Sequence, residues 1–162
     1  ASDEDAVRFE GPLEQRYVAR TGQVIACPEG IVVGGGITAQ GYTVVLVSGE
    51  MSGRIVFESY ATLVLDGSLS GSVEADNFAN GLVTGDITGR WIGHQHGTLY
   101  IQGILIGELE LEAESKVFIA GRTERADLER IHASAPVEVL LRDSDLEPGT
   151  HTIGNLTVTV PP

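Results

Sequence analysis

The amino-acid sequence predicts an all-β protein: a single-domain parallel β-helix (β-solenoid) with about 18 residues per coil. Three features recur at this period: two glycine series, several columns of apolar residues, and the alternation of apolar with polar residues between them. The glycine series are Gly49, Gly67, Gly85, Gly103, Gly121 and Gly53, Gly71, Gly89, Gly107. Repetition at a fixed period is typical of a solenoid, in which each coil stacks on its neighbour.

Apolar residues keep the register of the glycines. Period-two alternation with polar residues indicates strands with one buried face, so these residues should point inward and stack about 4.8 Å apart. Glycines should lie at corners of the coil, where a side chain would not fit. The three predicted inward columns are Val47, Leu65, Val83, Ile101, Ile119; Met51, Leu69, Ile87, Leu105; and Ile55, Val73, Trp91, Leu109.

The repeat divides the chain into segments. Residues 43–132 form five coils, residues 25–42 a degenerate first coil, residues 1–24 an N-terminal cap segment and residues 133–162 a C-terminal cap. In the degenerate coil, Val33, Gly35 and Ile37 occupy the matching columns. Residues 123–131 have a helix-like sequence, and the glycine pattern fails in the same stretch. This predicts a short helix or a distorted last coil. Right-handed winding is the general preference for parallel β connections.

The net charge of the protein indicates which classes of binding partner are favoured. Lys116 and nine arginines oppose 23 acidic residues, giving a net charge of −13. Such a surface repels phosphates and anionic lipids, which disfavours nucleic acid and membranes and favours a basic protein. Cys27 is the single cysteine, so no intrachain disulfide forms, in keeping with a cytoplasmic location. No signal-peptide pattern is present, although a signal removed earlier would leave no trace.

Two stretches resemble the repeats of bactofilins, bacterial cytoskeletal β-helices that polymerise end to end. They are Asp66-Gly67-Ser68-Leu69-Ser70-Gly71-Ser72-Val73-Glu74-Ala75 and Thr84-Gly85-Asp86-Ile87-Thr88-Gly89. The resemblance covers about 90 residues and implies a β-helix and, more weakly, self-assembly. The repeat decays at both ends, however, where polymerisation would need open faces. A monomer or small oligomer is therefore the expectation.

One outward column is apolar in all five coils and forms a ridge about 19 Å long. We expect a terminal segment, residues 7–24, to cover it; the alternative is a docking surface for a partner. The column comprises Leu46, Val64, Leu82, Tyr100 and Phe118.

A second group of outward residues is acidic and is the predicted partner-binding face. It should engage a basic protein, with apolar contacts from Tyr100 and Phe118 if these are uncovered. The alternative is a solvated charged surface. The carboxylates are Glu58, Glu74, Asp76, Glu110, Glu112 and Glu114.

His94 and His96 lie within this face, near Asp76, Glu112 and Glu114 of adjacent coils. Two imidazoles with carboxylates could bind zinc. Exposed pairs of histidines are common without metal, so we expect no bound metal and no cofactor. No nucleophile elbow, phosphate loop or zincin motif is present, and we expect no catalytic residues.

These features lead to three functional hypotheses. The first is a non-enzymatic binder that neutralises a basic protein, in the manner of immunity proteins that inhibit toxins. The second is a bactofilin-like self-assembling scaffold, and the third is a carbohydrate-active β-helix.

Overall fold

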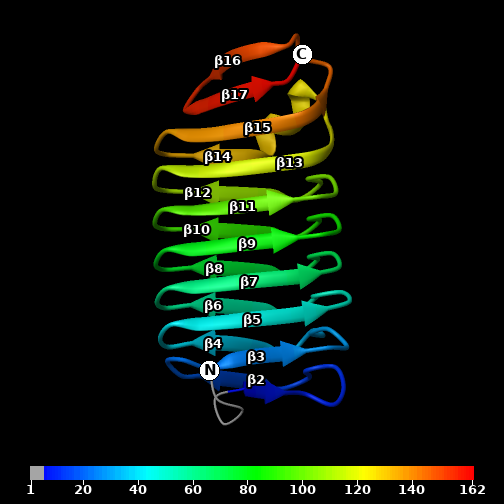
Figure 1. The fold of residues 1–162 in the computed structure, drawn as a ribbon, viewed down its shortest axis with the longest axis vertical. Coiled ribbons are helices and arrows are strands. Elements are labelled where there is room, and N and C mark those ends of the chain that lie inside the picture. The colour runs from blue at the N-terminus through cyan, green and yellow to red at the C-terminus, as the bar shows by residue number, and fades with distance from the viewer. Residues whose placement is uncertain (1–5) are drawn as a thin grey trace.

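Strands taken alternately along the chain build two parallel sheets that face each other across one hydrophobic core (Figure 1). The computed structural model describes residues 6–162. They form a β-solenoid of about nine coils with about 18 residues per turn, as the sequence predicts.

The first sheet has ten strands. Its members are parallel except for β16, which pairs antiparallel with β17 at the C-terminal end. In spatial order they are β1 (Ala6–Arg8), β3 (Val24–Cys27), β5 (Thr43–Ser48), β7 (Ala61–Asp66), β9 (Ala79–Val83), β11 (Gly97–Ile101), β13 (Ser115–Thr123), β15 (Val137–Ser144), β17 (Leu156–Val160) and β16 (Gly149–Ile153).

The second sheet has seven parallel strands, and a third, narrow side of the solenoid consists of single β-bridges. The bridges join Leu13, Ile31, Met51, Leu69, Ile87 and Leu105 in one column. The strands are β2 (Arg16–Ala19), β4 (Gly36–Ala39), β6 (Arg54–Phe57), β8 (Ser72–Ala75), β10 (Arg90–Gly93), β12 (Glu108–Leu111) and β14 (Ile131–Ala133).

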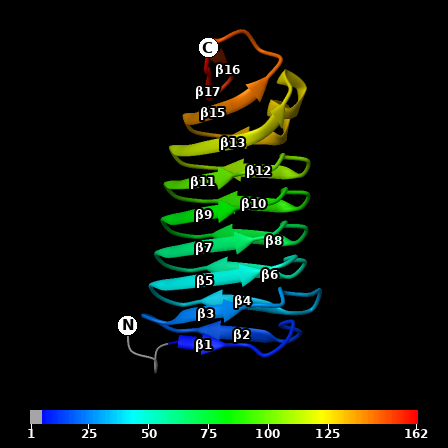
Figure 2. The same cartoon turned by 45° about the vertical axis from the view of Figure 1, so that its right-hand side comes forward.

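The winding is right-handed, as expected for parallel β connections. In Figure 1 the ten-stranded sheet lies in front with its parallel strands running to the right. The strands behind it run to the left as the chain climbs from the N-terminal to the C-terminal end. Figure 2, in which the right-hand side of Figure 1 comes forward, shows the same sense of winding.

The predicted internal stacks are confirmed. Val47 pairs in register with Leu65, Leu65 with Val83, Val83 with Ile101, and Ile101 with Ile119; all five are at most 2% exposed. Trp91, in a neighbouring column, is also buried and lies over Gly81. Stacking of equivalent apolar side chains thus supplies a continuous core through the coils.

The glycine series lie at the two corners that flank the bridge column, as predicted. A Cβ atom on Gly89 would overlap the carbonyl oxygen of Gly71 in the coil below, and one on Gly107 would overlap that of Gly89. At the other corner, Gly67 adopts φ +155° and packs in the same way on Gly49. Close backbone approach therefore requires glycine at these corners of the regular coils.

The degenerate coil is longer than the regular coils, because Val24 pairs with Val44 whereas Val44 pairs with Thr62. The prediction for Val33 is wrong: its side chain is 82% exposed, and Ile31 takes the inward place below Met51. Gly35 and Ile37 occupy their predicted columns. Residues 6–19 add a further coil through β1, Leu13 and β2; residues 1–5 of the predicted cap lie outside the described part.

The coil after β12 is also lengthened, because Leu109 pairs with Ile131 whereas Trp91 pairs with Leu109. The extra residues contain a 3-10 helix, η2 (Arg125–Arg130), with Leu128 buried. The prediction of a short helix in this region is confirmed. No helix of the described residues is long and apolar enough to cross a membrane.

Candidate functional site

The predicted acidic residues lie on the outer side of the seven-stranded sheet and in the turn that follows it. Glu74 belongs to β8 and Glu110 to β12, and the register Glu74–Ile92–Glu110 places them two coils apart in one column. The other four follow the ends of strands: Glu58 after β6, Asp76 after β8, and Glu112 and Glu114 after β12.

Basic side chains pair with several of these carboxylates. Arg54 Nη2 donates to Glu74 Oε1 at 2.8 Å, and Arg90 Nη2 donates to Glu110 Oε1 at 2.6 Å. Each arginine lies on a strand that pairs directly with the strand of its partner, so each ion pair joins neighbouring coils. These arginines make the acidic face less negative than the sequence suggested. The period of 18 residues alone does not show which long side chains reach a neighbouring coil.

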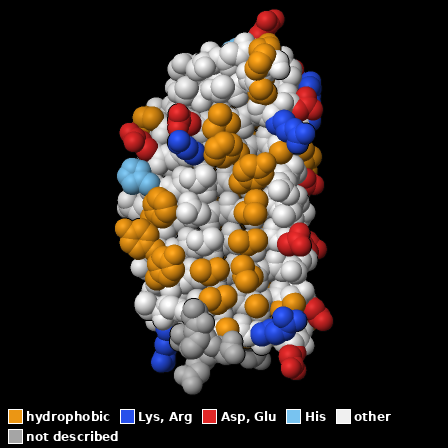
Figure 3. Space-filling view, in the orientation of Figure 1, with side chains coloured by type: hydrophobic (Ala, Val, Ile, Leu, Met, Phe, Trp, Pro, Cys, Tyr) orange, Lys and Arg blue, Asp and Glu red, His pale blue; other side chains and the backbone are white. Residues whose placement is uncertain are grey.

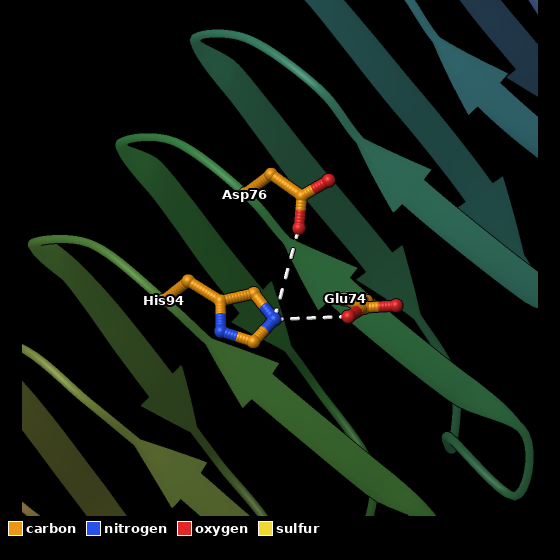
Figure 4. Close-up of side chains that lie close together, drawn as sticks. All are labelled: Glu74, Asp76 and His94. Atoms are coloured by element: carbon orange, nitrogen blue, oxygen red, sulfur yellow. Dashed lines mark hydrogen bonds and ion pairs between the residues drawn. The ribbon is translucent and has the colours of Figure 1, made fainter.

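His94 lies at the centre of a carboxylate cluster, which we define as His94, Glu74, Asp76 and Glu112. Figure 4 shows His94 with Glu74 and Asp76. His94 Nε2 is 2.9 Å from Glu74 Oε2 and 3.7 Å from Asp76 Oδ1, while Nδ1 contacts Glu112 Oε2. The backbone ladder sets this convergence. The amide of His94 donates to the Ala75 carbonyl, and that of Glu112 to the Gly93 carbonyl, so residues 76, 94 and 112 stack in successive coils.

The second histidine does not join the cluster. His94 and His96 lie in the turn between β10 and β11, so the strand alternation that would place them side by side does not apply. His96 Nδ1 lies 3.0 Å from the backbone carbonyl of Glu114. The predicted grouping of both histidines is therefore wrong, and Glu74 is the contact that spacing did not identify.

The carboxylates raise the pKa of His94 to about 9, because Glu112 and then Glu74 accept hydrogen bonds from its charged form. The same contact with His94, followed by that with Arg54, lowers the pKa of Glu74. Two carboxylates beside the imidazolium account for the raised pKa of His94, and two cations beside Glu74 account for the lowered pKa of that carboxyl.

A raised pKa predicts a pH dependence of stability. The stabilisation from His94 should be fully present below its ordinary pKa near 6.5 and should be lost as pH rises through about 9. The effect should stay below about 1 kcal/mol because the cluster is partly exposed. Thermal unfolding in EDTA at pH 6 and pH 9.5 should show a smaller difference for His94→Gln than for wild type. An NMR titration midpoint of His94 near 6.5 would contradict the pKa.

No segment of the described residues covers the outward apolar column on the ten-stranded sheet, so the expected cover by residues 7–24 is wrong. Those residues instead extend the solenoid at its N-terminal end. Leu46 and Tyr100 are each 39% exposed, and Leu140 on β15 continues the column beyond Phe118. Tyr100 and Phe118 stack with ring centroids 5.8 Å apart.

A second, aromatic column runs beside the first. Tyr42, Tyr60 and Phe78 immediately precede β5, β7 and β9, and all three are exposed. Figure 3 shows both columns as orange strips on one broad surface. We call this surface the apolar face; it consists of Tyr42, Tyr60, Phe78, Leu46, Val64, Leu82, Tyr100, Phe118 and Leu140.

Two shallow hollows indent the C-terminal half of this surface. One, of about 310 Å³, is lined mainly by apolar side chains that include Tyr100, Phe118, Leu140 and Pro161. The other, of about 370 Å³, begins at Phe78 and contains Lys116, Glu114 and Glu138. A partner could thus insert an apolar side chain in the first hollow and place polar groups in the second.

The predicted partner-binding residues are therefore divided between two sides of the molecule. Tyr100 and Phe118 project from the ten-stranded sheet, whereas Glu74 and Glu110 project from the seven-stranded sheet. Glu114 lies in the turn between them and lines the second hollow.

Comparison with known proteins gave no match to a family model, to a curated protein or to a solved structure. The β-solenoid thus rests on the structure itself, and no match supports the bactofilin family.

Proposed function

We propose that this protein is a non-enzymatic binding module that recognises a basic protein through its apolar face. The observation that carries the proposal is the pair of exposed apolar columns on one rigid sheet. Contiguous exposed apolar surface in a chain that is otherwise strongly charged is a feature of protein-interaction sites.

The composition of the apolar face supports a docking role. Tyr and Phe are the kind of large, stiff side chains that dominate binding energy when a partner buries them. Tyr60 and Phe78, with ring centroids 5.9 Å apart, immediately precede β7 and β9, and the stacked pair Tyr100 and Phe118 lies on β11 and β13. Each of these four strands is paired on both sides. Little ordering entropy is then lost on binding.

Charge supports the choice of a basic partner. The net charge of −13 attracts a basic protein from a distance, which raises the association rate and weakens as salt increases. Carboxylates already paired with arginine contribute less to this field. A toxin domain neutralised in the manner of immunity proteins is one partner of this chemistry.

The C-terminal end supports a monomer or small closed oligomer. There β16 pairs antiparallel with β17 and occupies the edge on which a further parallel coil would add. A terminal strand of reversed direction interrupts the parallel ladder that an added coil would continue. A scaffold that stacks end to end through this end is accordingly the less favoured function.

Two matched variants test the proposal by titration calorimetry against a basic protein captured on the wild-type chain. Tyr100→Ser/Phe118→Ser should weaken binding more than tenfold, about 1.4 kcal/mol or more, because it removes the central anchors. Glu58→Lys/Glu114→Lys, which leaves the ion pairs described above in place, should mainly slow association and reduce its salt dependence. Equal affinity for wild type and the aromatic variant would exclude the apolar face as the contact.

A further inference from the structure

The carboxylate cluster brings together the donor atoms that borderline divalent metals prefer. Oxygens of Glu74 and Asp76 and Nε2 of His94 lie within 4.8 Å of one another. In a tetrahedral zinc site with bonds of about 2.0 Å, ligand atoms are about 3.3 Å apart. The Nε2 distances of 2.9 Å to Glu74 and 3.7 Å to Asp76 lie on either side of that value.

Glu112 gives the cluster a feature that simple proximity of carboxylates does not provide. It contacts Nδ1 of His94, on the opposite edge of the imidazole ring from Glu74 and Asp76. By accepting a hydrogen bond from Nδ1–H, Glu112 fixes the tautomer in which Nε2 is free to coordinate. Carboxylates hold metal-binding histidines in this way in many proteins.

The ligands also come from rigid and adjacent coils. Glu74 and Asp76 lie at the end of β8, and His94 follows β10, whose Gly93 pairs in register with Ala75. The side chains are partly exposed, at 26%, 46% and 31% respectively, so an ion can enter from solvent and retain water.

We propose that Glu74, Asp76 and His94 bind a divalent transition-metal cation such as Zn²⁺, with Glu112 as the positioning residue for His94. Water completes the coordination. The sequence led us to expect no bound metal, and it grouped His94 with His96. The proposed site differs from that group because Glu74 takes the place of His96 as a ligand. The proposal is independent of the partner-binding function.

Binding should have a measurable consequence for stability. The metal links two coils in the folded state only, so zinc at about 100 times its dissociation constant should raise the melting temperature by about 5 °C or more.

The test uses the full chain without an affinity tag, stripped with EDTA and dialysed. Calorimetric titration with ZnCl₂ should give one saturable site. His94→Ala should abolish this site, and Glu112→Ala should weaken it by about 10- to 100-fold. Melting curves in EDTA verify that each variant folds. If His94→Ala does not fold, Asp76→Asn takes its place in the titration.

His132 provides the matched control. Its Nε2 lies 3.8 Å from Glu108 of the preceding coil, so it is another histidine beside a carboxylate on the same sheet. His132→Ala should bind zinc as wild type does. The proposal is overturned if wild type shows no saturable binding, or if His94→Ala binds as tightly as wild type. Unchanged binding by Glu112→Ala would remove its positioning role.

Discussion

Leu65→Asp is expected to unfold the protein. Leu65 is fully buried and pairs in register with Val47 and Val83, so the new carboxylate would lie unpaired between two apolar coils. Burying an unpaired charge and losing the packed leucine should together cost about 5 kcal/mol or more. That cost is comparable to the whole free energy of unfolding of many domains. Circular dichroism of the purified variant would show loss of the β signal.

Val64→Asp is the control for this prediction. Val64 is the preceding residue of the same strand, β7, but its side chain points outward on the apolar face. Its replacement should cost about 1 kcal/mol or less. If both variants were equally stable, or if Val64→Asp alone unfolded the protein, the assignment of inward and outward residues would be wrong.

Gly89→Ala should have the next largest effect on stability. A methyl group on Gly89 would overlap the carbonyl oxygen of Gly71, and backbone atoms of a paired coil cannot move aside as a flexible side chain can. Separating the two coils locally should cost about 3 kcal/mol. The change should appear as a lower denaturant midpoint in equilibrium unfolding.

Gly11→Ala is its matched control. A methyl group there would have no heavy atom of the described residues within 4 Å apart from those of its chain neighbours, and Gly11 is not among the described glycines with positive φ. The free energy of unfolding of the Gly11→Ala variant should stay within about 0.5 kcal/mol of the wild-type value. An equal loss in both variants would mean that the glycine series reflects backbone flexibility rather than close packing of coils.

Much of the fold follows from the period of the sequence. Because strand pairing between coils keeps a constant register, the spacing of Val47, Leu65 and Val83 is enough to place them in one stack. The same rule fails where coil length changes. An insertion between Ile31 and Gly35 places the side chain of Val33 on the outside of the solenoid. The inward position of Ile31 can be recognised only when its sequence is aligned with the Met51 column across the insertion.

The surface was less predictable, for a physical reason. Period 18 identified His94, Asp76 and Glu112 as neighbours, but the contact with Glu74 depends on how far the Glu74 side chain extends and how the His94 side chain rotates in the turn after β10. The exposure of Tyr100 depends on the path of residues 7–24. The sequence of these residues is too irregular for their pairing into β1 and β2 to be recognised from one coil.

The most direct test of the proposed binding surface is hydroxyl-radical footprinting of the protein alone and in complex with its captured basic partner. Oxidation of Tyr60, Phe78, Tyr100 and Phe118, all on the apolar face, should fall at least severalfold in the complex. Tyr17, which contacts Phe9 in the N-terminal coil, should react equally in both states and so serves as an internal reference. Unchanged oxidation of the four aromatic residues in a saturated complex would contradict the account.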